Sequence, residues 1–163
     1  MSAESSHLPP LPELHLHLDG SLRRSTLEEL AEPLEVIVPP GLGFHDGMGL
    51  QQALACFETS LAVLQTPRAV ERVAREICQD AEAGGVTTLE IRFAPQLHRG
   101  AALEEIVDAT LSGMADFSGS SGLVLCGLYG EEPAIFDRFL ELAATRRRVV
   151  GIDLAGGPAS GHD

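Results

Sequence analysis

The sequence predicts an α/β fold: a parallel (β/α) barrel of TIM type, of which this chain supplies the first four strands and their helices. Short apolar segments of strand character alternate with amphipathic segments of helical period, a pattern typical of a parallel sheet with right-handed crossovers. The first strand is not followed by the glycine-rich phosphate loop of an open doubly wound sheet. An eight-stranded barrel needs about 250 residues, and the chain has 163, so it would form a half-barrel.

The first strand is predicted over residues 13–18, where leucines alternate with polar residues. These leucines are Leu14, Leu16 and Leu18. A short helix is predicted to begin at Ser25, because Glu28 would complete a capping box with it. Pro33 is expected to end this helix, and a loop rich in proline and glycine follows over residues 34–49.

Two longer helices are predicted after this loop. The first is indicated by an apolar stripe at spacings of three and four residues. The stripe consists of Leu50, Leu54, Phe57, Leu61 and Leu64. Thr66 and Pro67 are expected to open the second helix, with proline in its first turn, and Gly84 and Gly85 to close it.

The rest of the chain is predicted to alternate strand and helix. Strands are expected over residues 87–94, 123–128 and 149–155, with helices over residues 101–117 and from Pro133 onward. No segment reads as a linker between domains. We therefore predict one domain over residues 1–163, with a flexible arm over residues 1–12 and a polar tail over residues 157–163.

Charge and composition narrow the class of partner. The formal net charge of −13 disfavours binding to nucleic acid or to an anionic membrane surface. The N-terminus lacks a signal pattern, and no segment is long and apolar enough to span a bilayer. The 3 cysteines are not spaced as a metal or redox motif and are typical of free thiols in a reducing compartment. We expect a cytoplasmic protein with a small-molecule partner, no nucleic acid and no membrane.

The first strand carries the residues that indicate chemistry. His15, His17 and Asp19 alternate along it, so we predict that they share one face and that the leucines share the other. In a barrel, such a face near the carboxyl end of a strand lines the active site. Two imidazoles can bind one zinc ion. A pair of histidines can also arise by chance, with each ring merely bonded to a neighbouring carbonyl. However, two histidines and an aspartate on one face would be costly to bury in a core without a function, which favours the metal site.

Three segments resemble the adenosine deaminase family, the metal-dependent purine nucleoside deaminases of the amidohydrolase superfamily. They are LPELHLHLDGSLRRSTLEELA (residues 11–31), GGVTTLEIRFAPQLH (residues 84–98) and VVGIDLAGG (residues 149–157). The segments lie in the order of the family and at about its spacing. The resemblance covers nearly the whole chain and identifies it with the N-terminal half of the family's barrel.

The resemblance implies roles for four residues. His15 and His17 would be two of the ligands of one zinc ion, the expected cofactor. His17, Asp19 and Gly156 would contact the substrate, with Asp19 bonding to the sugar and Gly156 lying against the purine ring.

The resemblance also assigns a lid. The helix over residues 50–64 would be this lid, with Leu54 and Phe57 lining it. Other polar side chains of the strands are expected to be structural: Glu90 and Arg92 as an ion pair inside the barrel, Asp153 likewise, and His98 as a loop residue.

The resemblance implies hydrolytic deamination, of adenosine to inosine and ammonia, in purine metabolism. The family takes its third histidine ligand and its proton-donating glutamate from a His-Ala-Gly-Glu motif after strand five, which does not occur in this sequence. No catalytic residue is therefore assigned within the chain, and we expect it to be inactive alone. We also expect it to self-associate or to pair with a C-terminal half.

Three alternatives remain open at this point. The strand-one motif is shared with deaminases of adenine and of aminofutalosine-type nucleosides. The chain could instead be a non-catalytic half-barrel that serves as a binding or assembly module. It could also be an unrelated α/β domain with a divalent-metal site.

Overall fold

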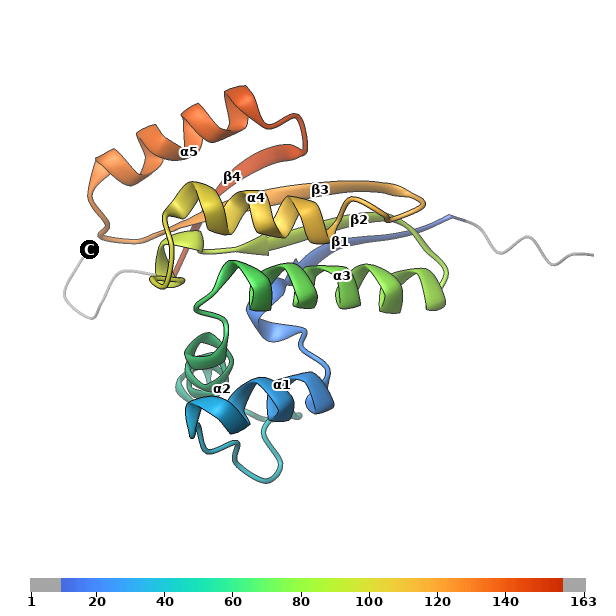
Figure 1. Ribbon diagram of the computed structural model, residues 1–163, viewed down its shortest axis with the longest axis vertical. Helices are drawn as coiled ribbons and strands as arrows, with labels where there is room; N and C mark the ends of the chain where they lie inside the picture. The colour runs from blue at the N-terminus through green and yellow to red at the C-terminus, as the bar shows by residue number, and fades with distance from the viewer. Residues whose placement is uncertain (1–9, 157–163) are drawn as a thin grey trace, which may run out of the picture.

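The computed structural model describes residues 10–156, and its four strands form one parallel sheet in the order β1-β2-β3-β4 (Figure 1). The strands are β1 (Leu11–His17), β2 (Val86–Phe93), β3 (Ser120–Leu128) and β4 (Val149–Ala155). Strands that follow one another in both sequence and space, with helices between them, make the half-barrel that the sequence predicts.

The strand boundaries confirm the sequence analysis at one end of the chain and correct it at the other. β4 begins and ends where it was predicted. Leu11 and Pro12 belong to β1, where they pair with Val86 and Thr88, so the arm predicted over residues 1–12 is too long. The remainder of that arm, residues 1–9, and the tail predicted over residues 157–163 lie outside the described residues.

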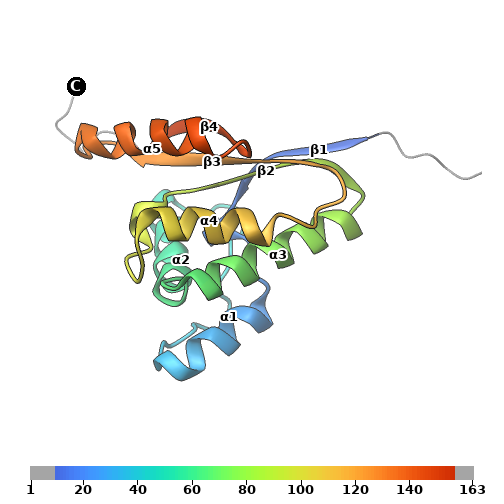
Figure 2. The same cartoon turned by 45° about the horizontal axis from the view of Figure 1, so that its top comes forward.

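Within the described residues, five α-helices and three short 3₁₀ turns connect the strands. The helices are α1 (Arg24–Ala31), α2 (Leu50–Val63), α3 (Pro67–Ala83), α4 (Leu103–Gly113) and α5 (Pro133–Thr145). The turns are η1 (Leu18–Gly20), η2 (Glu32–Leu34) and η3 (Pro95–Leu97). Figures 1 and 2 show α3 and α4 side by side along the sheet, while α1 and α2 lie beyond the end of β1. Among the described residues, no helix has the length and apolar character to cross a membrane.

The core lies on one face of the sheet. Leu89, Ile91 and Phe93 of β2 are almost completely buried and belong to a single apolar cluster with residues of β3 and of helices α3, α4 and α5. The intervening residues of β2, among them Arg92, point to the opposite face because side chains alternate along a strand. That opposite face, which would line the lumen of a barrel, is called the open face below.

Helix α1 begins one residue earlier than predicted. Arg23 is its N-cap, without a side-chain bond to the helix, and the capping box expected between Ser25 and Glu28 does not form. Glu28 instead accepts a bond from Arg24 Nε at 2.6 Å. Because the helix begins at Arg24, Ser25 lies inside it and cannot act as its N-cap, which explains the difference.

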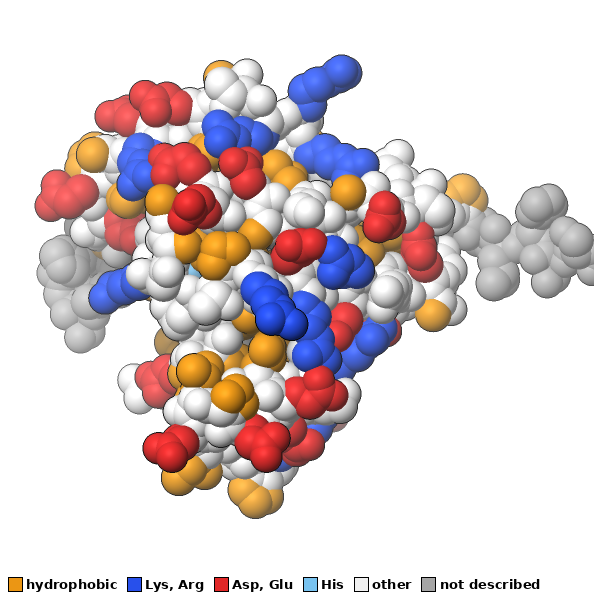
Figure 3. Space-filling view, viewed as in Figure 1, with side chains coloured by type: hydrophobic (Ala, Val, Ile, Leu, Met, Phe, Trp, Pro, Cys, Tyr) orange, Lys and Arg blue, Asp and Glu red, His pale blue; other side chains and the backbone are white. Residues whose placement is uncertain are grey.

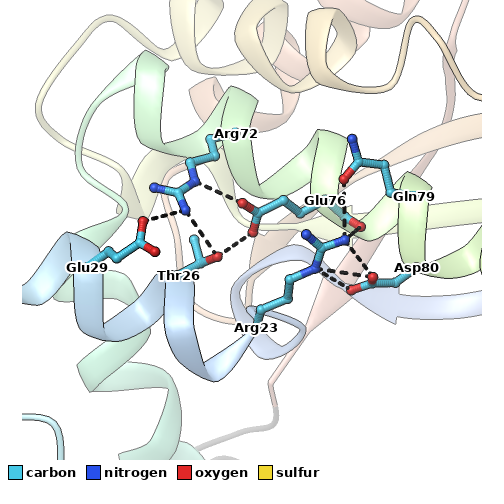
Figure 4. Close-up of polar contacts among 7 residues, drawn as sticks. All are labelled: Arg23, Thr26, Glu29, Arg72, Glu76, Gln79 and Asp80. Carbon is cyan, nitrogen blue, oxygen red and sulfur yellow. Dashed lines mark hydrogen bonds and ion pairs between the residues drawn. The ribbon is translucent and has the colours of Figure 1, made fainter.

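Ion pairs join α1 to α3 (Figure 4). Arg23 pairs with Asp80 at 2.6 Å, and Arg72 bridges Glu29 at 2.7 Å and Glu76 at 2.8 Å. On the surface seen in Figure 3, acidic and basic side chains are interspersed over these helices. Each exposed pair adds little alone, but the network fixes the position of α1, which follows directly on the turn at the end of β1.

The ends of α3 agree with the sequence, whereas those of α4 do not. Thr66 caps α3 by accepting a bond from the Ala69 N–H at 3.3 Å, and Gly84 is its C-cap. Helix α4 spans Leu103–Gly113 rather than residues 101–117. Met114 and Phe117 are buried although they lie after the helix, so their apolar character extended the predicted helix too far.

Replacing Gly113 with alanine is expected to loosen the contact between α4 and α3. A Cβ atom at Gly113 would lie 2.4 Å from the Glu71 carbonyl oxygen and 2.8 Å from the Ala74 Cβ. Because backbone must move to admit it, we expect a loss of about 1–3 kcal/mol in the free energy of unfolding, measured with urea. Gly84→Ala is the control, because the nearest described atoms to its Cβ would lie 3.4 Å away, at ordinary contact distance. Equal stabilities of the two variants would contradict the packing described.

Candidate functional site

The two histidines of β1 lie side by side. The ring centroids of His15 and His17 are 5.3 Å apart, with 42° between the ring planes. Two imidazoles bound to one tetrahedral zinc, each with a Zn–N distance of about 2.0–2.1 Å, have centroids roughly 5 Å apart. The spacing therefore fits two ligands of one ion.

The surroundings of His17 favour its neutral form. Burial lowers the pKa of its imidazole, and the nearby His15 and Arg92 lower it further, against the opposing effect of Asp153. Phe57 of α2 packs edge-on against the His17 ring, with centroids 5.8 Å apart. Zinc binds the neutral imidazole, so this environment suits a metal ligand.

The described part of the chain does not complete a metal site. Within residues 10–156, no group of three or more His, Cys, Asp or Glu side chains is arranged to hold a metal ion. His15 and His17 are thus two fitting donors of a set that needs further ligands.

Asp19 departs from the position predicted for it. β1 ends at His17, and Asp19 lies in the turn η1 rather than on the strand face with the histidines. Its side chain is buried, its Oδ1 has no hydrogen-bond partner among the described residues, and burial raises the pKa of its carboxyl to about 6. An unpartnered buried carboxylate oxygen is costly, and a hydroxyl or amine of a ligand would satisfy it.

Asp19 lines a pocket of about 120 Å³ between η1, the loop before α2, and α2 itself. Phe44, Cys56, Phe57 and Ser60 contribute to its wall. The lid residues expected on α2 differ in their surroundings. Phe57 packs between His17 and Phe44, whereas the Leu54 side chain is 53% exposed.

Gly156 directly follows β4. It therefore lies at the carboxyl end of the parallel sheet, the same end at which β1 stops. Its φ of +80° lies in the left-handed region that favours glycine, and within residues 10–156 the nearest atom to a Cβ there would be the Tyr129 nitrogen, at 4.0 Å. The predicted contact of Gly156 with a purine is compatible with this open position and stays a prediction.

Arg92 has a different partner from the one predicted. Its Nη1 donates to Asp153 Oδ2 of β4 at 2.7 Å, in place of an ion pair with Glu90. Glu90 is two residues from Arg92 on the same strand, so their side chains extend in parallel, while Asp153 faces Arg92 across β3. Strand alternation places all three side chains on one face, but only the sheet order could have identified the pair.

His98 was expected to be an ordinary loop residue, and it is buried instead. Its Nδ1 bonds to the Leu64 carbonyl oxygen at 2.5 Å, and burial lowers the pKa of its ring. Gln65 makes a second hydrogen bond between these segments: its Nε2 donates to the Leu97 carbonyl oxygen at 3.2 Å. These bonds fasten the end of α2 to the loop after β2. The sequence offers no local signal for contacts between segments so far apart.

Asp19→Asn is expected to change the pH dependence of stability. The folded state raises the pKa of this carboxyl from 3.8 to about 6, so ionising it destabilises the folded chain as the pH rises through that interval. The variant, compared with the wild type in the presence of a chelator, should gain about 2 kcal/mol in relative stability between pH 4 and pH 7, at about 1.36 kcal/mol per pKa unit. Urea unfolding at several pH values measures this. A difference that does not vary with pH would refute the burial of the charge.

Comparisons with known proteins agree with the fold and with one another. The sequence model of the family described as adenosine deaminase matches residues 10–162. The adenosine deaminase of Enterococcus faecalis is 37% identical over 175 residues, which cover 94% of this chain and 51% of that protein.

Solved structures also share the fold. The adenine deaminase of Arthrobacter aurescens has a TM-score of 0.72 and 30% identity, covering 94% of this chain and 50% of that one. The N6-methyl-AMP deaminase of Arabidopsis thaliana has a TM-score of 0.77 and 29% identity, covering 94% of this chain and 51% of that one. The chain spans about half the length of each of these three proteins.

Proposed function

The chain belongs to the adenosine deaminase family, and on that premise we propose that it provides one half of a zinc-dependent enzyme that deaminates a purine nucleoside, converting adenosine and water to inosine and ammonia. The observation that carries the proposal is the side-by-side placement of the His15 and His17 rings, with centroids 5.3 Å apart. The named relatives deaminate different purine compounds, so the substrate is part of the proposal.

His15 and His17 would hold the zinc ion, which when bound lowers the pKa of water and so supplies a nucleophile near neutral pH. The imidazoles bind as neutral donors, and the burial that lowers the pKa of His17 favours that form. The remaining ligands and the proton-donating group would come from the other half of the barrel, which closes the site from the far side.

Asp19 would select a nucleoside. Its buried Oδ1 has no partner among the described residues, and a carboxylate accepts a bond from a sugar hydroxyl but repels a phosphate. This favours adenosine over a nucleotide such as AMP. The pocket beside Asp19, walled by Phe57 of α2, would enclose the sugar end of the ligand.

The proposal can be tested by supplying the missing half. The chain joined to the C-terminal half of the Enterococcus relative should release ammonia from adenosine in the presence of zinc, and His17→Ala should abolish the release. Adenine and AMP serve as competing substrates. The chain alone should leave the absorbance of adenosine unchanged. A folded, zinc-loaded fusion without activity, or one indifferent to His17→Ala, would contradict the proposed function.

A further inference from the structure

One peptide group of β1, between Leu14 and His15, lies where the register of β1 on β2 is irregular. The register of β1 on β2 passes from Glu13 opposite Leu89 to Leu16 opposite Ile91, so three steps along β1 match two along β2. Leu14 and His15 have no partner residue on β2. An extra residue of this kind is a β-bulge, and bulges change the direction of side chains beside active sites.

The bulge changes which side chains face the helices. Leu16 packs against the core, as Ile91 opposite it does. Leu14, which strict alternation places on the same face as Leu16, is 47% exposed. His17 pairs with Arg92 of the open face. The course of the chain through the bulge therefore sets the direction in which His15 leaves the strand.

Two charged side chains bond to this peptide. Its N–H, from His15, donates to Glu13 Oε1 at 3.1 Å. Its carbonyl, from Leu14, accepts from Arg92 Nη2 at 3.4 Å. Both bonds are exposed to solvent, so water competes for these backbone groups, and the side chains of Glu13 and Arg92 restrain the direction of the peptide rather than being required to pair it.

Arg92 is itself held in place. Its other terminal nitrogen bonds to Asp153 of β4 at 2.7 Å, and the Arg92 side chain is only 15% exposed. The guanidinium thus extends over the open face from β1 to β4. Its planar set of donors can bind both strands at once, which a lysine ammonium in the same place could not do with the same geometry.

We propose that Arg92, anchored by Asp153, is a positioning residue for the zinc ligand His15, and that it acts by fixing the Leu14–His15 peptide together with Glu13. Residues that orient a metal ligand typically change metal affinity by about 10–100-fold when they are replaced. The proposal rests on the proposed zinc site, and it adds residues that contact neither the metal nor the substrate.

The first test needs no metal. Amide hydrogen exchange of His15 in the chelator-treated chain should accelerate in Glu13→Ala and in Arg92→Met, and should stay near the wild-type rate in Glu13→Gln, which keeps an acceptor oxygen. Unchanged exchange in Glu13→Ala and Arg92→Met would overturn the proposal whether or not the chain binds zinc.

The second test measures zinc affinity by competition with a chromophoric chelator, in the chain joined to the C-terminal half of the Enterococcus relative, which would supply the remaining ligands. Arg92→Met and Arg92→Lys should each bind zinc at least about tenfold more weakly than the wild type. Arg146→Met is the matched control, because it breaks another Arg–Asp pair, with Asp108 at 3.0 Å, on the helices. Wild-type affinity in Arg92→Met, or an equal loss in Arg146→Met, would overturn the positioning role. Absence of zinc binding by the wild type would instead refute the proposed function.

Discussion

Phe93→Ala should lower the free energy of unfolding of the chain by about 3–5 kcal/mol, as is usual for a large aromatic side chain removed from a core. Phe93 ends β2, one of the two inner strands of the sheet, and its side chain is 1% exposed. It packs against the ring of buried His98, with centroids 5.2 Å apart. Its loss would leave a cavity and weaken the loop that holds the end of α2. Chemical denaturation followed by circular dichroism measures the change.

Phe44→Ala is the matched control for this experiment. The Phe44 side chain is 56% exposed, so it buries little apolar surface on folding. We therefore expect Phe44→Ala to change the free energy of unfolding by no more than about 0.5 kcal/mol. If both phenylalanine variants lost the same stability, β2 would not be the centre of the core.

His17→Ala and His15→Ala should each weaken zinc binding by at least about tenfold, because a site with two protein ligands retains only one after either change. The two effects should not add: the double variant should bind scarcely less than either single variant, since one remaining imidazole already fails to hold the ion. Titration against a chelator of known affinity measures the zinc dissociation constants of the variants.

His45→Ala provides the control for histidine content. His45 is exposed in the loop before α2, where its Nδ1 lies 3.1 Å from the Asp46 carbonyl oxygen. Its replacement should leave zinc affinity unchanged. A loss equal to that of His17→Ala would place the metal elsewhere, and full additivity of the two β1 variants would indicate that each histidine binds its own ion.

Local sequence patterns correctly predicted the elements in which the local preference of the residues and the packing around them favour the same structure. The limits of β4 and the caps of α3 follow from alternation, proline and glycine alone, and the structure confirms them. The side-by-side placement of His15 and His17 was also predicted from alternation, and their ring centroids lie 5.3 Å apart.

The features of the site that the sequence did not predict depend on contacts between segments that are far apart in the chain. The bulge in β1 arises from its register on β2, so strict alternation misplaced Leu14. Asp19 was placed on the face of the histidines because alternation was extended past the predicted end of the strand, whereas the chain enters the η1 turn after His17. The partner of Arg92 lies 61 residues away, on a strand that only the sheet order brings opposite. These contacts shape the site, but no local pattern in the sequence identifies the residues that make them.

X-ray absorption spectroscopy at the zinc edge, on the chain loaded with one equivalent of zinc, addresses the shared metal site directly. We expect scattering from two imidazoles with Zn–N distances of about 2.0–2.1 Å, and we expect this signal to vanish in the double variant His15→Ala/His17→Ala. A wild-type spectrum with fewer than two imidazoles, or an imidazole signal that survives in the double variant, would show that these two rings do not bind one ion.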